Sequence, residues 1–103
     1  MPFQIMDSKI VAGFDWDDGN REKCKKHGVT VADIESAFAG TPVIGPDAAH
    51  STAETQFLAI GRASSGRHVF LAFTWRDRGG ANLIRVISAR YMHAKEVEHY
   101  EQG

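Results

Sequence analysis

Apolar and polar residues alternate with a period of two through much of the second half of the chain, which is typical of strands with one buried face. Three strands are predicted there, at residues 56–62, 67–76 and 82–90, separated by turn signals at 64–66 and 77–80. The last of them is rich in adjacent apolar residues and is predicted to be central rather than at an edge. An antiparallel meander is therefore expected.

The first half of the chain has helical spacing of its apolar residues instead. A short strand at 14–16 is followed by Asp17 as a helix N-cap, a helix over 19–27, and Gly28 as its left-handed C-cap. A second helix starts after Thr30, and its buried stripe is predicted to be Val31, Ile34 and Phe38.

Shorter elements complete the prediction. The second helix ends at residues 40–42, and a short strand is predicted at 43–44. A closing helix over 93–101 has three residues spaced to dock on the sheet, which are Ala94, Val97 and Tyr100. The order predicts an α+β fold in which a compact antiparallel sheet is flanked by two N-terminal helices and one C-terminal helix.

Length and composition narrow the class of protein. The 103 residues, 43% apolar and 24% charged, suit one soluble domain over 1–103, in which 1–12 is either a loose arm or a first strand through Ile10 and Val11. The single cysteine, Cys24, excludes an intramolecular disulfide scaffold and a Cys-rich zinc site. No apolar run approaches the roughly 18 residues that cross a bilayer, and no signal-peptide pattern is present, so a cytoplasmic location is expected.

The net charge of −1 means that any nucleic-acid contact must come from a local cluster of cations. Lys25, Lys26 and His27 form one such cluster at the end of the first predicted helix. Cations there complement the helix dipole, which also favours a protonated histidine, and the cluster could hold a phosphate or supply a general acid. A helix end chosen only for capping is the alternative.

Four arginines lie within or at the ends of predicted strands: Arg62, Arg67, Arg85 and Arg90. Guanidinium groups bind phosphate through two donors and stabilise the charge that develops when a 2′-hydroxyl attacks it. Arg85 interrupts an apolar strand and needs a cleft or a salt bridge, for which Glu54 and Glu96 are candidates. For Arg62 and Arg67, at hairpin ends, solvated charge is the alternative. Because Arg85 and Arg90 differ by an odd number, they share a face only if the strand ends or bulges between them.

Aromatic and histidine residues add weaker candidates. Tyr91 could stack on a base, as could Trp16 and Trp75, although aromatic residues in so small a domain more often belong to the core. The five histidines show no HxH or HExxH spacing, and only His93 and Glu96 could share a ligand face on one helix. No metal and no cofactor are therefore expected.

An ordered set of motifs over about residues 14–101 resembles the BrnT family. The motifs are Phe-Asp-Trp-Asp at 14–17, Lys-His-Gly-Val at 26–29, Ile-Gly at 60–61, Arg-Val-Ile-Ser-Ala-Arg at 85–90, and Glu96 with Tyr100. None of them is specific alone, but their order is. The resemblance implies a fold similar to the RelE-type toxins and metal-independent RNA cleavage that arrests translation. It also implies a BrnA-like ribbon-helix-helix antitoxin as partner, through which alone operator DNA is contacted.

The predicted site combines this resemblance with the positions of the charges. The expected catalytic residues are Lys26, His27, Arg85 and Arg90. The expected substrate-binding residues are Lys25, Arg62, Arg67 and Tyr91.

Two departures from the family pattern favour another hypothesis. Gln56 stands where many relatives have arginine, and the chain after Arg90 is acidic and aromatic where many relatives are basic. With the near-zero net charge, these favour a non-catalytic protein of the same fold that pairs with an antitoxin-like DNA-binding partner. A third hypothesis is a metal-dependent hydrolase built on His93 and Glu96.

Overall fold

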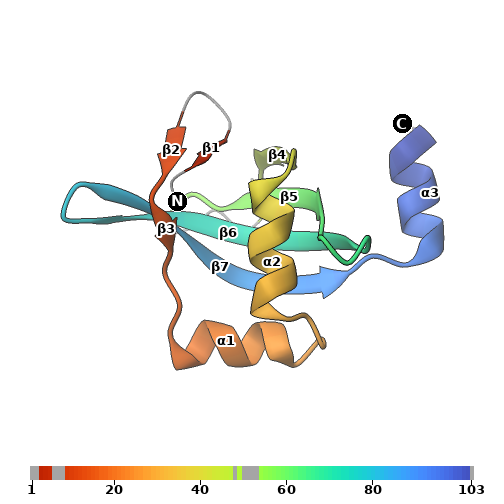
Figure 1. Cartoon of the computed structure of the whole chain (residues 1–103), viewed down its shortest axis with the longest axis horizontal. Helices are drawn as coiled ribbons and strands as arrows, with labels where there is room; N and C mark the ends of the chain where they lie inside the picture. Colours follow the sequence, from red (N-terminus) through yellow and green to blue (C-terminus); the bar gives the residue numbers. More distant parts are fainter. Residues whose placement is uncertain (1–2, 6–8, 48, 50–53, 103) are drawn as a thin grey trace.

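The computed structural model describes residues 3–5, 9–47, 49 and 54–102 (Figure 1). This part of the chain is an α+β structure with a five-stranded sheet in the order β3-β7-β6-β5-β4. The strands are β3 (Gly13–Phe14), β4 (Val43–Pro46), β5 (Phe57–Arg62), β6 (His68–Arg78) and β7 (Ala81–Tyr91), and the helices are α1 (Asp18–Lys25), α2 (Val31–Ala39) and α3 (Ala94–Gln102). β1 (Phe3–Ile5) and β2 (Lys9–Val11) form a separate antiparallel pair, so a strand does run through Ile10 and Val11.

The sheet is mixed, and the prediction of a purely antiparallel sheet is wrong. β4, β5, β6 and β7 are antiparallel in succession, but β3 pairs in parallel with β7 through Gly13 opposite Leu83 and Phe14 opposite Ile84. Alternation in a sequence indicates a strand and its buried face, but not the direction of its partner. The long chain between β3 and β7 supplies the crossover that parallel strands need.

The predicted signals set the helix boundaries. Asp17 is the N-cap of α1, and its side chain accepts a hydrogen bond from the backbone of Asn20 while the Asn20 side chain accepts one from the backbone of Asp17. Thr30 caps α2 by accepting from the backbone of Asp33. Gly28 has a φ of 77° and directs the chain from α1 toward α2, although α1 itself ends at Lys25, two residues before the predicted end.

The core lies between α2 and one face of the sheet. Ile34, Ala37 and Phe38 of α2 are buried, and the Phe38 ring meets Phe73 of β6 edge-on with centroids 5.1 Å apart. A Cβ on Gly61 would lie 2.6 Å from the backbone oxygen of Ala37, so glycine is what lets α2 approach β5 this closely. These contacts identify the side of the sheet that faces α2.

The other two helices lie at the margins of the sheet (Figure 1). α1 runs along the β7 side, and α3 extends beyond the end of β7. α3 has no buried residue, and Ala94 is exposed, so the prediction that Ala94 docks on the sheet is wrong. β7 continues to Tyr91 and leaves only two residues before α3 begins, which places the start of α3 past the sheet. In the described residues, no helix combines the length and the apolar character needed to cross a membrane.

Candidate functional site

A bulge in β7 decides where its two arginines point. Arg85 pairs with Thr74 of β6 and Arg90 pairs with Phe70, and these partners are four residues apart on a regular strand. They therefore lie on one face of β6. Ile87 is the extra residue in β7, because its two neighbours pair with adjacent residues of β6. Arg85 and Arg90 can share a face only if the strand ends or bulges between them, and β7 does bulge there.

That shared face is the one opposite α2, here named the far face. Gly61 and Phe73 point toward α2, so the residues that alternate with them point away from it. The far face includes Leu58, Ile60, Arg62, Phe70, Ala72, Thr74, Arg85, Ser88 and Arg90, and Gln56 and Ile87 line a cavity on it.

His27 and Arg90 lie beside the same small cavity on the far face. The cavity has a volume of about 120 Å³ and is lined by His27, Phe70, Ser88, Ala89 and Arg90. His27 is exposed and comes from the turn after α1. The Arg90 guanidinium lies over the Phe70 ring at 4.9 Å from its centroid. His27 and Arg90, from distant parts of the chain, therefore line one cavity.

Glu96 of α3 holds Arg90 in this position. Its two carboxylate oxygens each accept a hydrogen bond of 2.8 Å from the Arg90 guanidinium, and the backbone N–H of His93 donates a third bond of 2.9 Å. The Arg90 hydrogen bonds, followed by that of His93, lower the pKa of Glu96 from 4.5 to about 2. The same pairing raises the pKa of Arg90. The site therefore contains a built-in anion at neutral pH.

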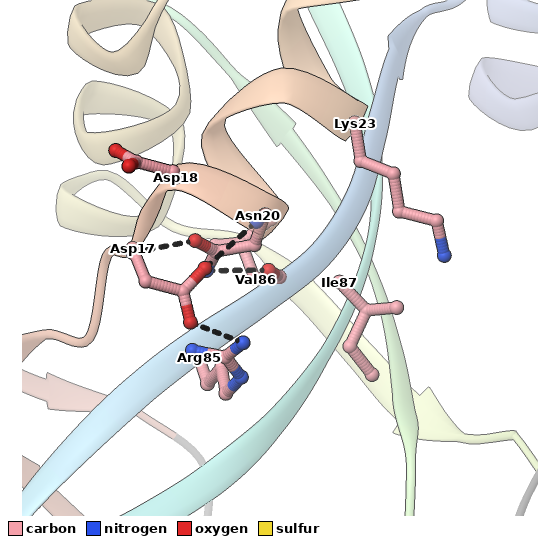
Figure 2. Close-up of a pocket in the computed structure, with 8 residues that line it drawn as sticks. Asp17, Asp18, Asn20, Lys23, Arg85, Val86 and Ile87 are labelled. Atoms are coloured by element: carbon pink, nitrogen blue, oxygen red, sulfur yellow. Dashed lines mark hydrogen bonds and ion pairs between the residues drawn. The ribbon is translucent and has the colours of Figure 1, made fainter.

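Arg85 forms a salt bridge, but not with the predicted partners. Its guanidinium lies 2.7 Å from the Asp17 carboxylate and 3.7 Å from that of Asp15. Glu54 pairs with Arg76 and Glu96 with Arg90, so neither is available to it. Figure 2 shows Arg85 directed toward Asp17, at a cavity of about 660 Å³ lined also by Asp18, Gly19, Asn20, Lys23, Val86 and Ile87.

The Asp17 carboxylate interacts with both α1 and β7. The backbone N–H of Asn20, and then Arg85, lower the pKa of Asp17. Arg85 thus attaches the start of α1 to β7, and its surroundings are more acidic than those of Arg90.

The lysine–histidine cluster is divided in the structure. Lys25 and Lys26 are exposed and line a shallow depression on α1 together with Gly19, Glu22 and Lys23. Only His27 reaches the cavity of Arg90.

Arg67 and Tyr91 lie on the α2 side of the sheet, away from Arg90. Tyr91 pairs with the buried Val69, its hydroxyl donates to Asp33 of α2 at 2.6 Å, and this bond is the main reason that its pKa is raised. The Arg67 guanidinium covers the Tyr91 ring at 3.5 Å. Arg62 falls on the far face by alternation, and its Nε donates to the backbone oxygen of Gly66 in the β5–β6 turn.

Sequence reasoning missed Asn20, which positions the site. Asn20 is 5% exposed, and its side-chain N–H groups donate to the backbone oxygens of Asp15 at 3.0 Å and Val86 at 2.9 Å. Its side-chain oxygen accepts from the backbone of Asp17. Asn20 therefore fixes α1, which is followed by the turn that carries His27, against β7, which carries Arg90. The Asp-x-x-Asn spacing of a capping box was the available signal.

Metal-ligating residues do not gather in the part of the chain that the structure describes. No group of three or more His, Cys, Asp or Glu side chains is placed there to hold a metal ion. Both Glu96 oxygens accept hydrogen bonds from Arg90, and the hydrogen bond that His93 donates to Glu96 comes from its backbone N–H. Cys24 is buried, which raises the pKa of its thiol.

A known protein family matches most of this chain. A family model described as "Ribonuclease toxin, BrnT, of type II toxin-antitoxin system" matches residues 16–96. The matched span begins just before α1 and ends at Glu96, so it includes both His27 and Arg90. No match was found among the curated proteins.

Proposed function

The chain belongs to the BrnT family of ribonuclease toxins of type II toxin–antitoxin systems, and we propose that it is a metal-independent endoribonuclease that arrests translation. The observation that carries the proposed site is the cavity shared by His27 and Arg90. A side chain that can transfer protons and one that can bind a phosphate face the same small space. We also propose that the chain is one domain with a fold similar to the RelE-type toxins.

The proposed reaction is attack of a ribose 2′-hydroxyl on the adjacent phosphorus. The 2′-oxygen forms a bond to phosphorus, the bond to the 5′-oxygen breaks, and a 2′,3′-cyclic phosphate remains. One proton leaves the 2′-hydroxyl and one reaches the 5′-oxygen. His27 transfers one of these protons and water transfers the other, because imidazole can accept or donate a proton near neutral pH. Arg90 donates to the non-bridging oxygens and stabilises the charge of the phosphorane.

The remaining cations serve the path of the RNA strand. Because Ile87 is the extra residue of the bulge, Arg85 and Arg90 lie four strand steps apart along β6, which at about 3.3 Å per step puts their Cα atoms roughly 13 Å apart. We therefore assign Arg85 to a different phosphate from Arg90. Lys25 and Lys26 add positive charge at the end of α1. Arg62 adds positive charge on the far face, beside the β5–β6 turn. Arg67 and Tyr91, on the α2 side, fall outside this path.

A type II system includes an antitoxin that binds the toxin, so the family implies such a partner. We propose that it is a BrnA-like ribbon-helix-helix protein, and that operator DNA is contacted only through it. The proposed RNA substrate places the toxin in the cytoplasm.

A second candidate function is a non-catalytic protein of this fold that binds the antitoxin. It is favoured by the ion pairs that occupy Arg85 and Arg90, and by the net charge of −1.

The test is cleavage of labelled single-stranded RNA by the purified chain in the presence of EDTA. We expect products that end in a 2′,3′-cyclic phosphate, at a rate that the chelator does not change. His27→Ala is expected to lower the rate by about 10²–10⁴-fold, and Arg90→Ala by about 10²–10³-fold. Arg21→Ala, an exposed arginine of α1 that the proposed site does not use, is the matched control and should retain the full rate.

Two results would separate the candidates. Loss of cleavage in EDTA would contradict metal independence. A folded chain that binds its antitoxin but leaves RNA intact would establish the second candidate instead.

A further inference from the structure

A second groove opens beside the proposed catalytic cavity, between α3 and the sheet. It has a volume of about 490 Å³, and its walls include Ile60 and Phe70 from the sheet and Met92, His99 and Tyr100 from the α3 side. These walls are apolar and aromatic. Lys95 and Glu96 also line the groove, so charged groups are present at an otherwise apolar site.

The groove and the catalytic cavity share a wall. Phe70 lines both of them, and the Arg90 guanidinium lies over the Phe70 ring at 4.9 Å. Glu96 lines the groove and also holds Arg90. A ligand in the groove would therefore reach the guanidinium by taking the place of one carboxylate.

The Glu96 carboxylate occupies the position that a phosphate would take. It meets the guanidinium with two parallel hydrogen bonds of 2.8 Å, which is the bidentate geometry that arginine also offers to phosphate. The two side chains are 41% and 36% exposed, so an incoming anion has access to the pair. An ion pair exposed to this extent contributes little stability, and exchange of its anion is therefore feasible.

We propose that this groove is a nucleotide subsite, in which a base lies against Phe70 and Tyr100 while its phosphate replaces Glu96 on Arg90. The ligand class is one nucleotide of a single-stranded RNA, so the inference rests on the proposed function and extends it. A nucleotide combines a flat face, which aromatic walls accept, with an anion, which Arg90 binds. Lys95, which also lines the groove, adds positive charge beside that anion. Glu96 then competes with the substrate and limits binding of anions that bring no base.

The test is a set of binding titrations on the folded chain with adenosine 5′-monophosphate, adenosine and inorganic phosphate. We expect the mononucleotide to bind at least about tenfold more tightly than either part alone, because both halves of the subsite are then filled. Tyr100→Ala should weaken mononucleotide binding about fivefold or more, the lower range for loss of base stacking, without changing phosphate binding.

Glu96→Gln tests the exchange of anions. Glutamine keeps an oxygen for the backbone of His93 but loses the charge that competes for Arg90, so mononucleotide affinity should rise about threefold or more. Glu98→Gln is the matched control, since it removes the same charge from an exposed position of the same helix and should leave the affinity unchanged.

The outcomes keep this inference separate from the proposed function. Equal binding of mononucleotide and phosphate, or equal effects of Glu96→Gln and Glu98→Gln, would overturn the subsite even if RNA is cleaved. Mononucleotide binding with the expected variant effects in a chain that cleaves no RNA would support the subsite and contradict the proposed function. A folded chain that binds neither the mononucleotide nor phosphate would overturn the subsite. The groove would then be a candidate site for a protein segment.

Discussion

Asn20 connects three segments of the chain through one buried side chain. It joins the N-cap Asp17, the backbone of Asp15 and the backbone of Val86 in β7. The Asn20 side chain is almost wholly shielded from water and its bond to Val86 is buried, so a partner left unpaired there would be destabilising. The position of His27 relative to Arg90 depends on this side chain, although Asn20 touches neither residue's cavity.

Asn20→Ala is expected to lower the free energy of unfolding by about 2–3 kcal/mol, because it leaves buried backbone groups without partners. Urea denaturation measures this change. Arg21→Ala, at the neighbouring exposed position, should change it by less than about 0.5 kcal/mol. A similar small effect for Asn20→Ala would show that the amide does not hold α1 against β7.

At this scale the sequence predicts which residues are unusual better than it predicts their partners. Arg85 stood out because it interrupts an apolar strand, and it does form a salt bridge. Its partners, Asp17 and Asp15, follow the short strand β3. Local sequence patterns do not show that β3 lies beside β7. For Phe70 the sequence predicts only a place in a strand. The cavities that Phe70 lines form only when β6, the turn after α1, and α3 come together.

Among the elements, β7 has the greatest influence on the site. Its bulge at Ile87 brings Arg85 and Arg90 to the far face, while Val86 and Ala89 on either side of the bulge both stay in the core. Caps and turns were predictable because their signals lie within a few residues, as at Asp17 and Thr30. The bulge and the parallel β3–β7 pair were not, because they depend on pairing between distant strands.

Acidification is expected to weaken the attachment of α3. The pKa of Glu96 is lowered to about 2 from 4.5, so its bond to Arg90 contributes stability that is full above about pH 4.5. That contribution is lost as the pH falls from about 4.5 toward 2, because the carboxylate becomes protonated. As the pH falls through this window, the amides of residues 94–102 should lose protection against hydrogen exchange, measured relative to their intrinsic exchange rate at each pH.

Glu96→Gln is the control for this effect. The variant should show faster exchange in α3 already at pH 7, and no further step that belongs to α3 between pH 4.5 and 2. Exchange in α3 of the unchanged chain that stays constant through this window, relative to the sheet, would contradict the role of Glu96.

Over the whole molecule, the net charge of −1 limits how RNA is bound. Two of the cations on the far face, Arg85 and Arg90, have acidic partners within the chain. The proposed interface therefore uses a few phosphates and the apolar groove beside α3, rather than a broad basic surface. This distribution also suits a toxin whose activity must be controlled by a partner.

RNA binding should accordingly depend only weakly on salt. Each phosphate contact with a single strand contributes about −0.7 to the slope of log K against log salt. The two phosphates assigned to Arg85 and Arg90 give a slope of about −1.4, and contacts by Lys25, Lys26 and Arg62 extend it to at most about −3.5. Titrations with a non-cleavable 2′-deoxy analogue measure it. Arg85→Ala should make the slope shallower by about 0.7. A slope steeper than about −4 would indicate a larger basic surface than the proposed path provides.

The most direct test of the central claim is bacterial growth after induction of this chain, beside a double variant with Arg85→Ala and Arg90→Ala matched for soluble expression. We expect that the unchanged chain arrests growth, that cellular RNA is degraded during the arrest, and that the double variant does neither. Normal growth with abundant, soluble, unchanged chain would contradict the ribonuclease assignment and favour the non-catalytic antitoxin-binding protein.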